Sequence, residues 1–302
     1  MNSAVEGFPL APQQKRVWLS QQQDGFPYLC EATIRIEGEL DRVALRRALD
    51  RVIASHEILR TRFCRVPGLE FPLQVISADG TTEFGGEISG LPDFENGPLL
   101  RFGLGEGADG AYVLSVRASA LQADARSMHN LARAIAAAYQ AIVAGGDLDT
   151  DPVQYVQFSE WQNEILAADE SVDGKRFWTQ QADVAPEITL PFEADAAGAS
   201  KIGRMPGPFL NMPAGGVAPR AALLACWTAQ LSRRAGQKLV AVRVRTDGRP
   251  YAEMHDGLGL YERWPLLRST IEGEMTFAEL AQGVDAALGE LDSWQEYYSG
   301  EG

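Results

Sequence analysis

The sequence has 302 residues, and its 27 Lys and Arg against 41 Asp and Glu give a formal net charge of −14. Apolar residues make up 45% and charged residues 23%, which excludes a disordered or fibrous chain. The acidic balance disfavours binding to nucleic-acid backbones, and the length predicts about two domains.

The sequence indicates neither secretion nor insertion into a membrane. No stretch approaches the roughly 18–20 apolar residues of a membrane helix, and the start, MNSAVEGFPLAP, lacks the regions of a secretory signal. Three separated cysteines without a CxxC pair, Cys30, Cys64 and Cys226, favour a reducing cytoplasm. We expect a cytoplasmic protein without a disulfide framework or bound metal.

Strands and helices are predicted to alternate in the first half. Residues 32–37 alternate as a strand, and a helix begins after Asp41, a plausible N-cap. A second strand covers 112–117, and a helix follows over 127–143. Residues 155–181 look helical and rich in aromatics.

The second half begins with a connector over 191–219 that is rich in glycine and proline, with one short strand near 208–212. A helix over 221–235, a strand over 239–244, an extended segment over 258–268 and a helix opened by the Thr276–Glu279 capping box follow. The fold class is therefore mixed α/β, in two halves.

Several segments, in order, resemble motifs of nonribosomal peptide synthetase condensation domains. They are LAPQQKRVWL (10–19), SHEILRTRF (55–63), YVQFSEWQ (155–162) with Phe177-Trp178, GRPYAEMHDGLGLY (248–261), PLLR (265–268) and MTFAEL (275–280). The resemblance implies two lobes similar to chloramphenicol acetyltransferase, with carrier proteins delivering thioesters on phosphopantetheine arms. We assign 1–165 to the N-terminal lobe, 166–190 to an inter-lobe helix and 191–302 to a shortened C-terminal lobe.

The family's third motif, His-His-x-x-x-Asp-Gly, is degenerate here. The window between the strand and the helix contains Ser119, Ala120, Asp124 and Ala125, so both histidines and the glycine are missing. The resemblance places the catalytic histidine at Ala120. An alanine cannot act as a general base, a role that contributes roughly 10²–10⁴-fold to rate.

No other histidine replaces it in the sequence. His129 lies on the following helix, His56 belongs to a motif in which the family's histidine is structural, and His255 lies in a loop. Ser119 would be a nucleophile only beside a base. We therefore assign no catalytic residue and no metal site.

Asp124 is expected to be structural. In the family this aspartate pairs with an arginine of the second motif, which predicts an Arg60–Asp124 ion pair with Arg62 as the fallback. The alternative is two solvated charges.

A cluster of arginines marks the helix after Asp41. Arg42, Arg46, Arg47 and Arg51 could meet an acidic partner, or form an ordinary solvated helix face.

Three functional hypotheses follow. The first is a non-catalytic platform that binds carrier proteins, neighbouring synthetase domains or a trans-acting oxygenase or other tailoring enzyme, with phosphopantetheine present only on a partner carrier. The alternative is an active condensation or acyltransferase domain that joins a carrier-bound acyl thioester to an amine or alcohol by proximity. The third is a vestigial spacer.

Overall fold

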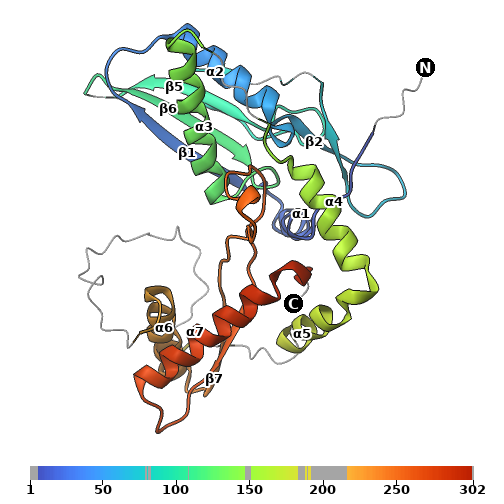
Figure 1. The fold of residues 1–302 in the computed structure, drawn as a ribbon, viewed down its shortest axis with the longest axis vertical. Helices are drawn as coiled ribbons and strands as arrows, with labels where there is room; N and C mark the ends of the chain where they lie inside the picture. The colour runs from blue at the N-terminus through green and yellow to red at the C-terminus, as the bar shows by residue number, and fades with distance from the viewer. Residues whose placement is uncertain are drawn as a thin grey trace. The chain divides into compact units, whose positions relative to one another are not determined.

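The computed structural model describes residues 6–78, 80, 83–107, 109–146, 151–182, 188, 190–191 and 216–300. The chain divides into two compact units (Figure 1). Unit 1 comprises residues 1–168 and 247–262, and unit 2 comprises 169–246 and 263–302. The segment 247–262 therefore belongs with the N-terminal half, although our division assigned all of 191–302 to a second lobe.

Unit 1 is built on a four-stranded sheet in the order β1-β6-β5-β4. Strand β6 (Tyr112–Ser119) pairs antiparallel with both β1 (Leu29–Ile36) and β5 (Arg101–Glu106), and β4 (Glu83–Gly85) runs parallel to β5. The expected strands at 32–37 and 112–117 are confirmed as β1 and β6. Because β6 buries alternate residues, it presents an apolar face to the core.

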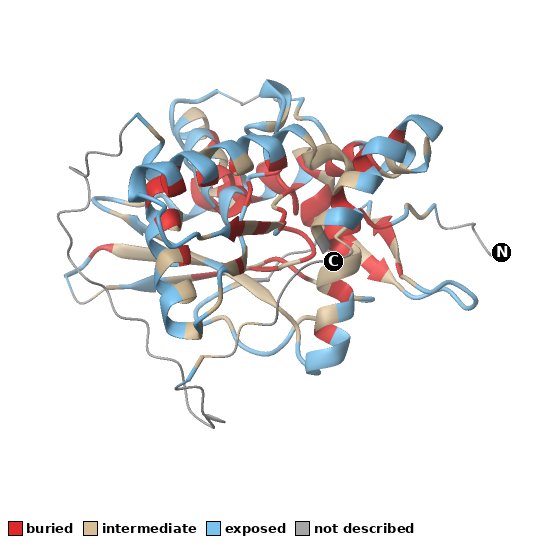
Figure 2. Cartoon of the chain, turned by 90° about the horizontal axis from the view of Figure 1, so that it is seen from below, coloured by how far each residue is buried: buried red, intermediate tan, exposed pale blue. Residues whose placement is uncertain are grey.

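Helices α2 (Arg42–Ser55) and α3 (Ala125–Val143) pack against each other beside this sheet (Figure 1). Asp41 caps α2 as expected: its carboxylate accepts hydrogen bonds from the amides of Val43 and Ala44. The core of the unit combines buried side chains of α2 and α3 with those of β5 and β6. The buried residues of α2 and α3 recur at helical spacing, and Figure 2 shows helices of the chain with buried positions on one side and exposed positions on the other.

The remaining elements of unit 1 frame this core. Helix α1 (Pro12–Asp24) contacts α4 (Tyr155–Ala167), and β2 (Thr61–Cys64) pairs with β3 (Leu73–Ile76) after the 3₁₀ turn η1 (Glu57–Arg60). A second 3₁₀ turn, η4 (Ala252–Met254), lies in the segment 247–262.

Unit 2 contains the antiparallel pair β7 (Leu239–Arg243) and β8 (Leu266–Thr270). Helices α6 (Pro219–Ala235) and α7 (Phe277–Ser293) pack on each other and contact these strands. Helix α5 (Val172–Ala182) follows the 3₁₀ turn η2 (Asp169–Ser171), and η5 (Gln295–Tyr297) follows α7. The expected capping box is confirmed: Thr276 Oγ1 accepts from the amide of Glu279, whose carboxylate accepts from the amide of Thr276.

Two of the expected elements need correction, and a third falls on residues that the structure does not describe. The helical stretch 155–181 is two helices, α4 and α5, with a break at 168–171. The extended segment 258–268 contains only the first part of β8, since residues 258–262 form a loop. The short strand expected near 208–212 lies outside the described residues. No described helix combines the length and apolarity needed to cross a bilayer.

Candidate functional site

The candidate site is the turn between β6 and α3. Strand β6 ends at Ser119, whose buried Oγ accepts a hydrogen bond from the amide of Leu121. Ala120 is half-buried, and its amide donates to the carbonyl of Tyr28. Ala125 is exposed and begins α3. Only a methyl group therefore projects from position 120.

The three histidines are not gathered at this turn. His129 and His255 are exposed. His56 is buried, with Nδ1 2.9 Å from the carbonyl of Val52, and burial lowers its pKa. A neutral His56 at pH 7 fits a packing role at the end of α2.

Cys30 is the nearest thiol to the turn, and it is unsuited to nucleophilic attack. Its Sγ donates to the carbonyl of Ala123 at 3.2 Å. Burial, with the nearby charges of Glu262 and Asp124, raises its pKa to about 12. The thiol is therefore protonated at neutral pH.

Asp124 is the structural centre of the turn. Its fully buried carboxylate caps α3 by accepting from the amide of Ser127 at 2.7 Å. It also forms a bidentate ion pair with Arg249, with Oδ2–Nη1 and Oδ1–Nη2 distances of 3.0 Å. The amides of Tyr261 and Glu262 donate to Oδ2 at 2.9 and 3.0 Å. One carboxylate thus joins the start of α3 to the segment 247–262.

Arg249 makes several further contacts, although its buried Nε has no hydrogen-bond partner among the described residues. Its guanidinium, whose side chain is fully buried, also contacts Asp247 Oδ1 at 3.0 Å and Ser127 Oγ at 2.8 Å. The ring of Tyr261 lies 4.2 Å from its central carbon, a cation–π contact. These interactions compensate for burying the charge.

A glycine allows the close approach of this segment. Gly259 has a φ of +152°, and a Cβ there would lie 1.9 Å from the ring of Tyr155. Its amide and carbonyl both hydrogen-bond to Ser127 Oγ. The hydroxyl of Tyr155 donates to the carbonyl of Leu260 at 2.7 Å, which fixes the segment on its other side.

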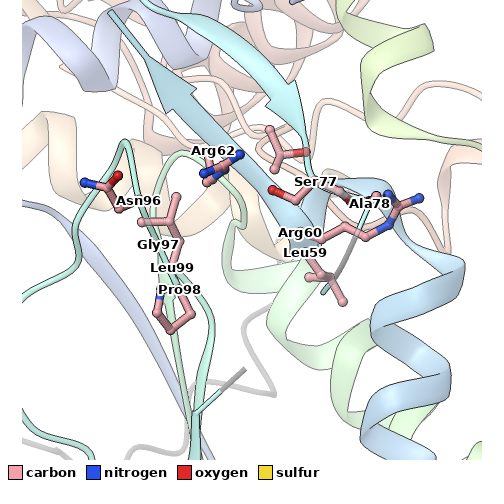
Figure 3. Close-up of a pocket in the computed structure, with 10 residues that line it drawn as sticks. Leu59, Arg60, Arg62, Ser77, Ala78, Asn96, Gly97, Pro98 and Leu99 are labelled. Carbon is pink, nitrogen blue, oxygen red and sulfur yellow. Dashed lines mark hydrogen bonds between the residues drawn. The ribbon is translucent and has the colours of Figure 1, made fainter. Parts of the chain in front are cut away.

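The expected Arg60–Asp124 ion pair is not formed. Arg60 donates to the carbonyl of Ser77 at 2.6 Å and lies 3.8 Å from Glu57. The fallback, Arg62, contacts the carbonyl of Glu95 at 3.4 Å. Both arginines line a pocket of about 290 Å³ with residues 77–78 and 96–99 (Figure 3). Arg62 projects outward because β2 buries Thr61 and Phe63 on its other face.

The α2 arginines are partly neutralised. Arg42 lies 3.3 Å from Glu106, and Arg46 lies 3.0 Å from Asp50. Arg47 is exposed, and Arg51 is half-buried. This face therefore carries less free positive charge than its sequence indicates.

Metal binding finds no support in the part of the chain that the structure describes. No group of three or more His, Cys, Asp or Glu side chains there could hold an ion.

Comparisons with known proteins are consistent throughout. A family model described as "Condensation domain" matches residues 5–300. The probable non-canonical nonribosomal peptide synthetase CymA of Salinispora arenicola is 29% identical over 93% of this chain. The alignment spans 4% of CymA, and this chain spans between 4% and 12% of the curated relatives.

Solved structures agree on the fold. The first condensation domain of the CDA synthetase superposes with a TM-score of 0.80 at 20% identity, covering 97% of this chain and 76% of that one. The X-domain from teicoplanin biosynthesis, solved in complex with OxyB, gives 0.78 at 23% identity, covering 98% and 72%. The mixed α/β class and the two-lobed architecture expected from the sequence are confirmed.

Proposed function

The chain belongs to the condensation-domain family, in the context of nonribosomal peptide synthesis, and we propose that it is a non-catalytic member that binds other proteins of an assembly line. Ala120 carries this proposal. It occupies the position at which the motif resemblance puts the catalytic histidine, and it offers no proton acceptor to an attacking amine. The nearby Cys30, protonated at neutral pH, supplies no nucleophile in its place.

The frame around the missing histidine is intact, which supports a retained binding role. Asp124 and Arg249 are both fully buried and hydrogen-bonded, so the turn and the segment 247–262 are held as one structure. Such a network is costly to leave half-satisfied. Because the network is present and the histidine is absent, we infer that this domain has kept a binding surface and lost the condensation activity.

The proposed partners are carrier proteins, neighbouring synthetase domains, or a trans-acting oxygenase or other tailoring enzyme. The X-domain among the structural neighbours was solved bound to a second protein, OxyB. By this proposal phosphopantetheine enters only as the arm of a carrier, and the domain itself binds no cofactor. We further propose that the domain is cytoplasmic, and that the exposed Arg47 with its neighbours Arg42, Arg46 and Arg51 contributes one of the contact surfaces.

Calorimetry tests this function. The purified domain is titrated with each carrier protein and each free-standing tailoring enzyme encoded beside it. We expect saturable binding of at least one of them, and the same affinity from an Ala120→Ser variant, because binding needs no base at this position. Absence of binding to every protein in the set would contradict the proposal.

The same proteins decide between the platform and the alternative enzyme. Loaded donor and acceptor carriers are incubated with the domain, and the product is followed by mass spectrometry. Binding without product supports the platform, whereas product above the no-protein control supports condensation by proximity.

A further inference from the structure

Helix α6 differs in charge from the rest of the chain. Its sequence, PRAALLACWTAQLSRRA, contains three arginines and no carboxylate, within a protein of net charge −14. The basic residues of this helix thus form a local positive region, of the kind that steers acidic partners.

The exposed side of α6 combines this charge with apolar surface. The buried face consists of Ala221, Ala222, Ala225 and Thr228. On the opposite side, Leu223 is 49% exposed and Trp227 is 57% exposed. Most tryptophans are buried, so a tryptophan this exposed at the middle of a helix is informative.

Helical geometry aligns two arginines with this tryptophan. Arg220 and Arg234 lie seven residues before and after Trp227, and a step of about 100° per residue brings both within about 20° of it. We call Arg220, Leu223, Trp227 and Arg234 the α6 stripe. It presents an aromatic anchor with a positive charge about 10 Å away along the helix on each side.

Of the two arginines of the stripe, Arg234 remains available to a partner, unlike Arg42 and Arg46 on α2. Arg234 is exposed, and none of the ion pairs among the described residues involves it. Arg220 is partly engaged, because it donates to the carbonyl of Arg245 and interacts electrostatically with Asp292. On α2, by contrast, Arg42 and Arg46 already face carboxylates.

We propose that the α6 stripe docks an acidic amphipathic helix of a partner protein. Trp227 and Leu223 pack on the apolar side of that helix, and its carboxylates pair with Arg220 and Arg234. Exposed tryptophan and arginine are the residues that most often dominate binding energy at interfaces. This inference deepens the proposed function, on which it rests for the premise that the domain binds proteins.

A designed peptide probes the stripe directly. The probe is a fluorescein-labelled amphipathic helix of about five turns, with leucines on one side and glutamates flanking them. Its counterpart carries lysines in place of the glutamates. Anisotropy titrations compare the unaltered protein with Trp227→Ala and Arg234→Glu, and with Arg133→Glu on α3, an exposed arginine outside every proposed contact surface, as the matched charge reversal.

We expect the glutamate peptide to bind at least about tenfold more tightly than the lysine peptide, and salt to weaken it. Trp227→Ala and Arg234→Glu should each weaken it by about tenfold or more, while Arg133→Glu changes it less than about twofold. No peptide binding, equal binding of both peptides, or equal losses in all three variants would overturn the inference. Self-association abolished by Trp227→Ala would overturn it too, because a second copy would then occupy the stripe.

Failure of this inference is distinguishable from failure of the proposed function. A carrier or tailoring enzyme that binds with unchanged affinity to both stripe variants refutes the α6 stripe and leaves the platform intact. Peptide binding with the expected losses, but no binding of any assembly-line protein, refutes the platform and leaves the stripe as a site.

Discussion

Replacing Asp124 with alanine should be the most damaging single change to unit 1. It removes the carboxylate that accepts hydrogen bonds from three backbone amides and from both terminal nitrogens of Arg249. Arg249, fully buried, would retain neutral contacts with Ser127 and Gly257 but only one carboxylate, that of Asp247, whose side chain is 41% exposed. Leaving one member of a buried pair without its partner costs about 3–5 kcal/mol, and we expect that loss in the free energy of unfolding.

Urea denaturation followed by circular dichroism measures this loss, and hydrogen exchange locates it. Amides in 247–262 should lose protection in Asp124→Ala, because that segment is fixed by the missing carboxylate. The control is Asp256→Ala, since the Arg133–Asp256 pair is exposed and should contribute at most about 1 kcal/mol.

A double variant isolates the pair itself. Asp124→Ala with Arg249→Met no longer buries an unpaired charge, so its loss should be smaller than the sum of the two single losses. A loss below about 1 kcal/mol for Asp124→Ala, or strict additivity in the double variant, would refute the structural role assigned here.

Three further predictions concern His56, Cys30 and Gly259. Burial lowers the pKa of His56, so the unfolded chain binds a proton at this residue before the folded chain does as the pH falls below about 6.5. The free energy of unfolding should therefore decrease in that pH range, and it should decrease less in His56→Gln. Urea midpoints measured as a function of pH test this. Iodoacetamide at pH 8 should label the exposed Cys226 well before Cys30, whose pKa is raised to about 12. Equal labelling rates for the two cysteines, measured by peptide mass spectrometry, would contradict the conclusion that Cys30 is buried and protonated. Gly259→Ala should destabilise by at least about 2 kcal/mol because its Cβ meets an aromatic ring at 1.9 Å, whereas Gly273→Ala, with nothing within 4 Å, should leave the thermal midpoint nearly unchanged.

Local signals in the sequence predicted the elements well. Asp41 and Thr276 begin helices because each side chain bonds an amide within three residues, a contact that spacing alone predicts. The edge strand β1 and its neighbour β6 were predicted from alternation for the same local reason. The break between α4 and α5 was missed because aromatic residues continue on both sides of it.

Long-range pairing was not predictable in the same way. Asp124 and Arg249 are 125 residues apart, and no periodicity links an arginine in a loop to a helix cap. The Gly-Arg-Pro segment was identified by its family resemblance, yet the same resemblance assigned Arg60, with Arg62 as the fallback, as the partner of the aspartate. The partner follows from two features of the fold: Arg60 donates to the carbonyl of Ser77, and the course of 247–262 brings Arg249 to Asp124. Similarly, the exposure of Trp227 depends on which face of α6 packs in unit 2.

The most direct test of the non-catalytic role is a single-turnover assay with donor and acceptor carriers loaded with their thioester substrates. An active condensation domain acting on its own carriers serves as the positive control. We predict no condensation product above the no-protein background, because position 120 bears a methyl group in place of a base. Time-dependent product well above that background, at a rate proportional to the concentration of this domain, would contradict the account.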